Sequence, residues 1–170
     1  SSDLLMIWNT TNTQLEVYDG SYWLNMAGKL VSTLNVGDSY GGGKVAYIFT
    51  SSDPGYIAGQ THGLIAATSD QTTDAGVIWF PSSAFFGATA ISLGQGSFNT
   101  LSIIAAAGTA TLSSYAAGLT NSYRGGGYTD WYLPSKEELN KLYLNRVAIG
   151  NFAQFQLMIF ILNLVIKRFR

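Results

Sequence analysis

The chain has 170 residues, a formal net charge of −1 and no cysteine. This length supports one domain with its own core and a short extension, and the lack of cysteine excludes disulfides and structural zinc held by thiolates. Acidic residues outnumber basic ones before Val147, which argues against nucleic acid as a partner. Abundant glycine, enriched aromatic residues and sparse charge favour a loop-rich extracellular module over a cytosolic helical enzyme.

The N-terminal residues 4–26 have the pattern of a β-hairpin. Leu4–Trp8 is an apolar run, and Leu15–Tyr18 alternates like a half-exposed strand. A hairpin of this size is only marginally stable alone, so it must pack on a larger body or on copies of itself. We therefore expect Tyr18 and Trp23 to contribute to assembly.

The middle of the chain predicts short strands separated by turns, and then two short helices. Strands are expected at Val45–Phe49, His62–Ala67 and Gly76–Trp79, and helices at Asn99–Ala107 and Thr111–Leu119. The triple glycine Gly41–Gly43 lacks the spacing and the following helix of a phosphate loop. It is therefore interpreted as a turn that needs positive φ angles.

The clearest local signal in the sequence is the start of a helix at Ser135. Pro134 restrains the chain, and Ser135 can accept a hydrogen bond from the amide three residues later, while Glu138 can reach back to Ser135. This capping box predicts a helix that ends near Gly150, a plausible stop residue.

Six short blocks follow one another over residues 36–152: Gly37-Asp38-Ser39-Tyr40 with Gly42-Gly43, His62–Ala67, Asp70-Gln71, Gly76-x-x-Trp79, Gly94-Gln95-Gly96 with Asn99-Thr100, and Tyr128–Leu139. Their order and spacing resemble the C-terminal domain of the Legionella collagen-like adhesin and its bacterial relatives. The resemblance implies an α+β, C-type-lectin-like domain with short strands and a few helices at the end of a secreted or cell-surface fibre. It also implies trimeric assembly and glycan binding. The N-terminal hairpin is similar to hairpins of fibrous, trimeric surface proteins.

The last residues depart from the pattern of these relatives after Phe152. Residues 154–166 are mostly apolar, and the run is shorter than the about twenty residues that span a bilayer, so a membrane anchor is not favoured. The composition matches a fully buried or aggregation-prone strand, and a truncated or frameshifted end is the leading explanation. Leu157, Ile159 and Ile161 are expected to contribute to assembly.

Catalysis and metal binding have weak support. His62 is the only histidine, and its place at the start of an apolar strand favours a structural role over that of a general base. Asp70 and Asp74 are weak candidates for a calcium site, because they are oxygen donors on predicted loops. They lack the spacing of an EF-hand loop. No cofactor is assigned with certainty, and calcium is the candidate.

Sugar recognition needs flat aromatic faces together with polar side chains for the hydroxyl groups. The candidate ligand-binding residues are Tyr128, Asp130, Trp131 and Asn99. Tyr128, Asp130 and Asn99 are expected to be exposed, whereas alternation on a strand should place at least one of Trp131 and Tyr132 in the core. Trp79 is also expected in the core. The body lacks the basic groove that a sulfated glycosaminoglycan would favour.

These observations predict an α+β, C-type-lectin-like domain preceded by a β-hairpin, with boundaries at 1–35 for the hairpin connector, 36–153 for the adhesin-type domain and 154–170 for the apolar tail. The expected function is a non-enzymatic adhesin or tip module of a bacterial surface fibre, extracellular or on the cell surface. It would bind a glycan or a surface receptor as a homo-oligomer, a trimer or a fibre. The alternative is a structural fibre subunit that polymerises through residues 157–166 by strand addition. A third, weaker interpretation is contact of the apolar, basic-ended tail with a membrane surface.

Overall fold

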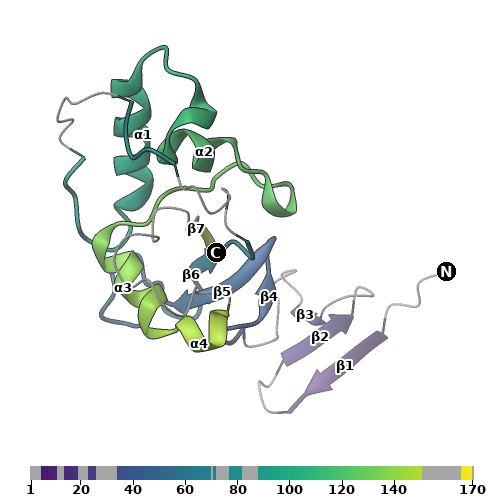
Figure 1. Cartoon of the computed structure of the whole chain (residues 1–170). Helices are drawn as coiled ribbons and strands as arrows, with labels where there is room; N and C mark the ends of the chain where they lie inside the picture. Colours follow the sequence, from purple (N-terminus) through teal and green to yellow (C-terminus); the bar gives the residue numbers. More distant parts are fainter. Residues whose placement is uncertain are drawn as a thin grey trace. The chain divides into compact units, whose positions relative to one another are not determined.

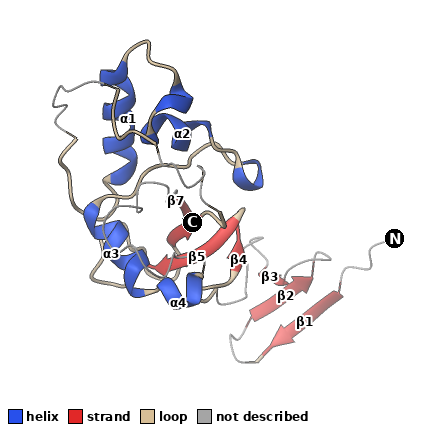
Figure 2. Cartoon of the chain, in the orientation of Figure 1, coloured by secondary structure: helices blue, strands red, loops and turns tan. Residues whose placement is uncertain are grey.

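A computed structural model describes residues 5–10, 14–18, 23–25, 34–69, 71, 77–81, 88–150 and 166–169 (Figures 1 and 2). The chain divides into two compact units, Ser1–Leu34 and Asn35–Arg170. The described residues form two antiparallel sheets and four α-helices, so the protein is of the α+β class.

The first unit is a three-stranded antiparallel sheet. Its strands are β1 (Leu5–Asn9), β2 (Gln14–Tyr18) and β3 (Trp23–Asn25), in the spatial order β1-β2-β3. The expected hairpin strands are therefore present. The predicted assembly residues Tyr18 and Trp23 lie opposite each other on β2 and β3, with ring centroids 5.3 Å apart. Glu16 is buried in β2, and its Oε1 accepts a hydrogen bond of 2.7 Å from Nδ2 of Asn9.

The second unit is built on a four-stranded antiparallel sheet of order β4-β5-β6-β7. Its strands are β4 (Ser39–Tyr40), β5 (Gly43–Ile48), β6 (Gly63–Ala66) and β7 (Ile166–Phe169). All four residues of β6 are buried, as expected for a short continuous apolar strand with neighbours on both sides. The strands predicted at Val45–Phe49 and His62–Ala67 are thus confirmed, with ends shifted by one or two residues.

The described residues of the second unit also form four α-helices and two 3₁₀ turns (Figure 1). The α-helices are α1 (Gly96–Ala107), α2 (Ala116–Ser122), α3 (Lys136–Leu144) and α4 (Arg146–Ile149), and the 3₁₀ turns are Leu112–Ser114 and Gly125–Gly127. Helices α3 and α4 contact β5, and α1 contacts α2.

Two expectations for the helical region need correction. The helix predicted at Thr111–Leu119 is instead a 3₁₀ turn followed by α2, because Tyr115 is extended and its ring is buried. The strand predicted to end at Trp79 is reduced, among the described residues, to a single parallel bridge between Ile78 and Tyr115.

Among the residues that the structure describes, the apolar core forms two clusters. One lies between the sheet and helices α3 and α4, and contains Ala46, Phe49, Leu64, Ala66, Leu93, Tyr132, Leu142, Ile149 and Ile166. The other lies around α1 and α2, and contains Ile103, Tyr115, Ala116, Ala117 and Leu133. The segment from Tyr132 to Leu133 contributes to both clusters, so it fixes the helical part of the unit to the sheet.

The capping box at the start of α3 is confirmed. The Glu138 backbone N–H donates to Ser135 Oγ, and the Glu138 carboxylate accepts from the Ser135 backbone N–H at 2.8 Å. Glu138 is fully buried, and it also accepts hydrogen bonds from the backbone N–H groups of Gly94 and Gly96 and from the Tyr132 hydroxyl. One carboxylate therefore joins two segments that lie far apart in the sequence, residues 94–96 and 132–138.

The C-terminal end of the chain is a strand of the sheet. Strand β7 pairs with β6 in antiparallel register, from Gly63 opposite Phe169 to Ala66 opposite Ile166. Ile166 is fully buried, and it also exchanges two backbone hydrogen bonds with Tyr132, of 2.7 and 3.0 Å. The predicted assembly residues of the tail, Leu157, Ile159 and Ile161, lie outside the described residues. Within the described ranges no helix is long and apolar enough to cross a membrane.

Candidate functional site

Two glycine turns of the second unit are in direct backbone contact. Gly41 and Gly42 form the two-residue turn between β4 and β5, with φ angles of 56° and 83°. Positive φ at both central residues is the requirement of a type I′ hairpin turn, and it confirms the prediction for this glycine run. A Cβ added to Gly42 would lie 2.6 Å from Cα of Gly126, in the turn Gly125–Gly127. Only glycine on both sides allows this approach, which fixes the start of the segment that carries Tyr128.

The side chain of Lys167 joins the candidate ligand-binding residues to the sheet. Its Nζ lies 3.2 Å from the Tyr128 ring centroid, 5.9 Å from a ring centroid of Trp131 and 4.0 Å from Oδ1 of Asp130. Lys167 is buried on β7, with 5% of its side chain exposed. Burial lowers the pKa of this ammonium, and the Asp130 carboxylate opposes that effect only in part.

Tyr128 and Asp130 are both exposed, as predicted. Tyr128 is 43% exposed, and the Asp130 side chain is 59% exposed. Because both approach the same ammonium, an aromatic ring and a carboxylate lie together on this surface. Lys167, which sequence reasoning placed in an atypical tail, is thus a further residue of the site. No local pattern signals this, because Lys167 reaches Tyr128 only through the pairing of β7 with β6.

Trp131 has a structural role next to the site. It is 3% exposed, its Nε1 donates a hydrogen bond of 3.1 Å to the carbonyl oxygen of Gly125, and its ring packs edge-on against Tyr123. Tyr132 is buried as well, so the prediction that at least one of these two aromatic residues lies in the core is confirmed. The prediction that Trp131 offers its face to a ligand is therefore corrected, since its contacts hold the turn before Tyr128.

The side-chain amide of Asn99 is already used inside the chain. Its Nδ2 donates to the carbonyl oxygen of Ala90 at 2.6 Å, and its Oδ1 accepts from the Ala90 N–H at 3.3 Å. Asn99 is half-buried rather than exposed. Among the contacts of the described residues none joins it to Tyr128 or Asp130, so its role is to fix the segment before α1.

Trp79 differs from its expected place in the core, because it is 50% exposed. The neighbouring Ile78 is exposed too, and its backbone pairs with Tyr115. A short apolar run predicts a buried strand only when another layer covers it, and the sequence alone does not show which side chains are covered.

The proposed calcium ligands Asp70 and Asp74 lie outside the described residues. Within the described part of the chain there is no group of three or more histidine, cysteine, aspartate or glutamate side chains that could hold a metal ion. His62 is buried, and its Nε2 lies 2.9 Å from Oε1 of Gln60. This contact fits the structural role expected for His62.

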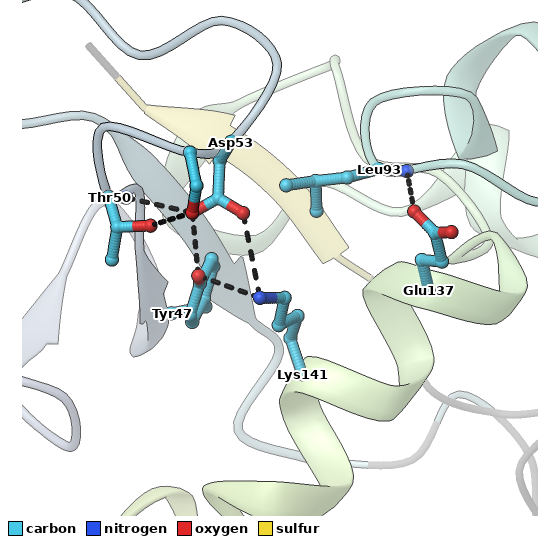
Figure 3. Close-up of polar contacts among 7 residues, drawn as sticks. Tyr47, Thr50, Asp53, Leu93, Glu137 and Lys141 are labelled. Carbon is cyan, nitrogen blue, oxygen red and sulfur yellow. Dashed lines mark hydrogen bonds and ion pairs between the residues drawn. The ribbon is translucent and has the colours of Figure 1, made fainter.

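A second polar cluster, which sequence reasoning did not identify, connects β5 to α3 (Figure 3). The Tyr47 hydroxyl donates to Oδ2 of Asp53 at 2.6 Å, and the Lys141 ammonium donates to the Tyr47 hydroxyl at 2.8 Å and lies 3.5 Å from Oδ1 of Asp53. Burial acts to raise the pKa of Asp53, but hydrogen bonds from Tyr47 and Thr50 and the Lys141 charge outweigh it, so the pKa lies below its usual value. Each polar group of this cluster has a partner, so the cluster holds the loop after β5 against α3.

Comparison with protein-family models, with curated proteins and with solved structures gave no match to this chain. The resemblance to bacterial fibre adhesins therefore rests on the sequence motifs. Among the described residues, Tyr128 and Asp130 form the candidate ligand-binding surface around Lys167.

Proposed function

We propose that the chain is a non-enzymatic adhesin or tip module of a bacterial surface fibre, extracellular or on the cell surface, that binds a glycan or a surface receptor. The carrying observation is that the Tyr128 ring and the Asp130 carboxylate are exposed together and meet the same buried ammonium of Lys167. The resemblance implies that the protein acts as a homo-oligomer, a trimer in its relatives.

The chemistry of this surface suits a sugar. The exposed part of the Tyr128 ring can pack against the C–H groups of a pyranose, and the Asp130 carboxylate can accept hydrogen bonds from two neighbouring hydroxyl groups. The exposed charge of this surface is the Asp130 carboxylate, whereas the Lys167 ammonium is buried, so a neutral sugar is favoured over a sulfated one.

The surface is held in place before any ligand arrives. Lys167 lies against the Tyr128 ring and Asp130, Trp131 holds the preceding turn, and the backbone contact between Gly42 and Gly126 fixes that turn to the sheet. A ligand therefore meets side chains that have already lost much of their freedom. Such preorganisation lowers the entropic cost of binding.

A glycan array screened with calcium, and again with a chelator, tests this function. Selective binding by the whole chain, lost in Tyr128→Ala and in Asp130→Asn, supports it. Tyr56→Ala is the matched control, because Tyr56 is 40% exposed and Tyr128 is 43% exposed. An array that stays blank under both conditions, together with no binding to host-cell surfaces, would overturn the proposal. Loss of binding in chelator would add a cation to the site.

In the alternative function, a fibre subunit joins its neighbours through residues 157–166. Of this segment the structure describes Ile166. Ile166 is paired within its own chain, with Ala66 on β6 and with Tyr132. This end of the segment is therefore already used in the sheet.

The membrane-surface interpretation needs a basic patch at the end of the chain, and the described residues there do not form one. Neighbouring residues of a strand point to opposite faces. Lys167 meets Tyr128, whereas the Arg168 guanidinium lies 4.9 Å from the Phe49 ring. The two charges are thus directed into different parts of the second unit.

A further inference from the structure

The outer strand of the first unit exposes four apolar side chains in succession. In β1, Leu5 is 54% exposed, Met6 53%, Ile7 40% and Trp8 62%. Because side chains alternate along a strand, apolar groups are exposed on both faces of β1. Scattered exposed apolar residues are ordinary, but an unbroken run on one strand is typical of an interaction surface.

The backbone of β1 also has an open edge. The spatial order β1-β2-β3 places β2 on one side of β1, and no other described strand pairs with its second side. Strand edges in monomeric proteins are usually protected by charged residues, proline or bulges. The β1 sequence Leu-Met-Ile-Trp-Asn contains none of these charges and no proline, and its register with β2 is regular.

We propose that β1 pairs edge to edge with β1 of a second copy of this chain, antiparallel about a two-fold axis at Ile7. Two three-stranded sheets then form one continuous six-stranded sheet. The proposal concerns the first unit alone, and it stands whether or not the second unit binds a glycan.

In this register the three central residues of β1 meet apolar partners, and Leu5 lies opposite Asn9 of the second copy. Ile7 lies opposite Ile7 of the second copy, and Met6 lies opposite Trp8, a pairing of thioether and aromatic ring that is favourable across strands. The strand carries no charge, so no like charges meet. Glu16 lies opposite Ile7 on β2, where it is buried and accepts a hydrogen bond from Asn9, so its carboxylate has a partner within the first unit.

The size of the contact sets its strength. One strand of five residues provides less surface than the about 800 Å² per partner that a standard stable interface buries. We therefore expect a reversible dimer whose population rises with protein concentration. This two-fold dimer differs in stoichiometry from the trimer that the sequence resemblance implies.

Cysteine cross-linking of the full chain tests the register directly, because the chain has no native cysteine. Directly opposed residues of an antiparallel pair have Cα atoms within disulfide range. Ile7→Cys should form a disulfide-linked dimer readily, whereas the control Val147→Cys, at an 88% exposed apolar position of the second unit, should not. A mixture of Met6→Cys with Trp8→Cys should cross-link better than either variant alone. Equal cross-linking by Ile7→Cys and Val147→Cys would overturn the proposal.

Sedimentation velocity over a range of concentrations provides the second measurement. The unmodified chain should shift from monomer toward dimer, and Ile7→Lys should weaken the dimer by roughly tenfold or more, because two like charges then face each other. Val147→Lys should behave like the unmodified chain. Mixing Ile7→Lys with Ile7→Glu should restore the dimer. A monomer at every concentration, or an oligomer that Ile7→Lys leaves intact, would contradict pairing through β1, and circular dichroism confirms that each variant is folded.

Discussion

The ammonium of Lys167 lies 3.2 Å from the ring centroid of Tyr128. This contact links the last strand of the sheet to the exposed segment that carries the candidate ligand-binding residues. A cation over an aromatic face is attracted by the ring quadrupole, and the attraction is larger where the cation is desolvated. The position of Tyr128 therefore depends on β7, although the two residues are far apart in the sequence.

Lys167→Met should change how stability depends on pH. Burial lowers the pKa of Lys167 in the folded chain, whereas in the unfolded chain it keeps the ordinary lysine value of about 10.4. Between these two values the unfolded state holds more protons, so this residue makes stability rise with pH. Methionine has no such proton. Urea unfolding should show the unmodified chain gaining stability relative to the variant as the pH is raised toward about 10. Parallel curves for the two proteins would contradict the buried charge.

Glu138→Gln should be strongly destabilising. The buried carboxylate accepts hydrogen bonds from three backbone N–H groups, those of Gly94, Gly96 and Ser135, and from the Tyr132 hydroxyl. An amide replaces one acceptor oxygen by an NH₂ group that faces these donors, and we expect a loss of about 2–4 kcal/mol in the free energy of unfolding.

Glu137→Gln is the matched control for Glu138→Gln, because it makes the same change one residue earlier. Glu137 is exposed, and its carboxylate accepts a hydrogen bond from the Leu93 N–H at 2.9 Å (Figure 3). Its loss should cost about 1 kcal/mol or less. Similar losses for the two variants in chemical denaturation would show that the buried network does not carry the stability assigned to it.

The signals that the sequence predicts well are local ones. The capping box needs only the spacing of Ser135 and Glu138, and the hairpin turn needs only the positive φ angles that Gly41 and Gly42 adopt easily. In both cases the interacting groups are a few residues apart, so the sequence itself holds the geometry.

The relationships that the sequence did not predict depend on distant segments. Lys167 becomes part of the site because β7 pairs with β6 across about one hundred residues of chain, a separation that no local pattern reports. The burial of Trp131 and the exposure of Trp79 also depend on distant segments, because a side chain is buried only where another part of the chain packs over it. Tyr47, Asp53 and Lys141 meet only after α3 has packed on β5.

Asp53→Asn should weaken the protein at neutral pH and less so in acid. The folded-state pKa of Asp53 lies below its usual value, so its contribution is full above the unfolded-state pKa of about 3.9 and is lost as the pH falls through the lower folded-state value. The stability difference between the unmodified chain and the variant should therefore shrink as the pH is lowered below about 4.

Tyr47→Phe provides the matched test of the Asp53 cluster. The variant keeps the ring but removes the hydroxyl that donates to Asp53 and accepts from Lys141. Without that donor the pKa of Asp53 should rise toward its ordinary value, and the acid-dependent part of the stability should become smaller. Thermal unfolding followed at several pH values measures both effects. An Asp53→Asn difference that stays constant with pH would contradict them.

Gly42→Ala should separate the cost of a close contact from the cost of backbone strain. Gly42 has φ +83° and Gly59 has φ +75°, so alanine is strained by a similar amount at both positions. A Cβ at Gly42 would lie 2.6 Å from Cα of Gly126, whereas a Cβ at Gly59 would meet no atom within 4 Å. Urea unfolding should therefore show Gly42→Ala less stable than Gly59→Ala by about 1–3 kcal/mol, the usual cost of overpacking. To relieve the close contact at Gly42, the turn Gly125–Gly127 would have to move, together with the segment that carries Tyr128. Ligand binding should therefore weaken in Gly42→Ala and not in Gly59→Ala. Equal stability of the two variants would mean that the glycine turns can separate freely, and that the surface around Tyr128 is not fixed by their contact.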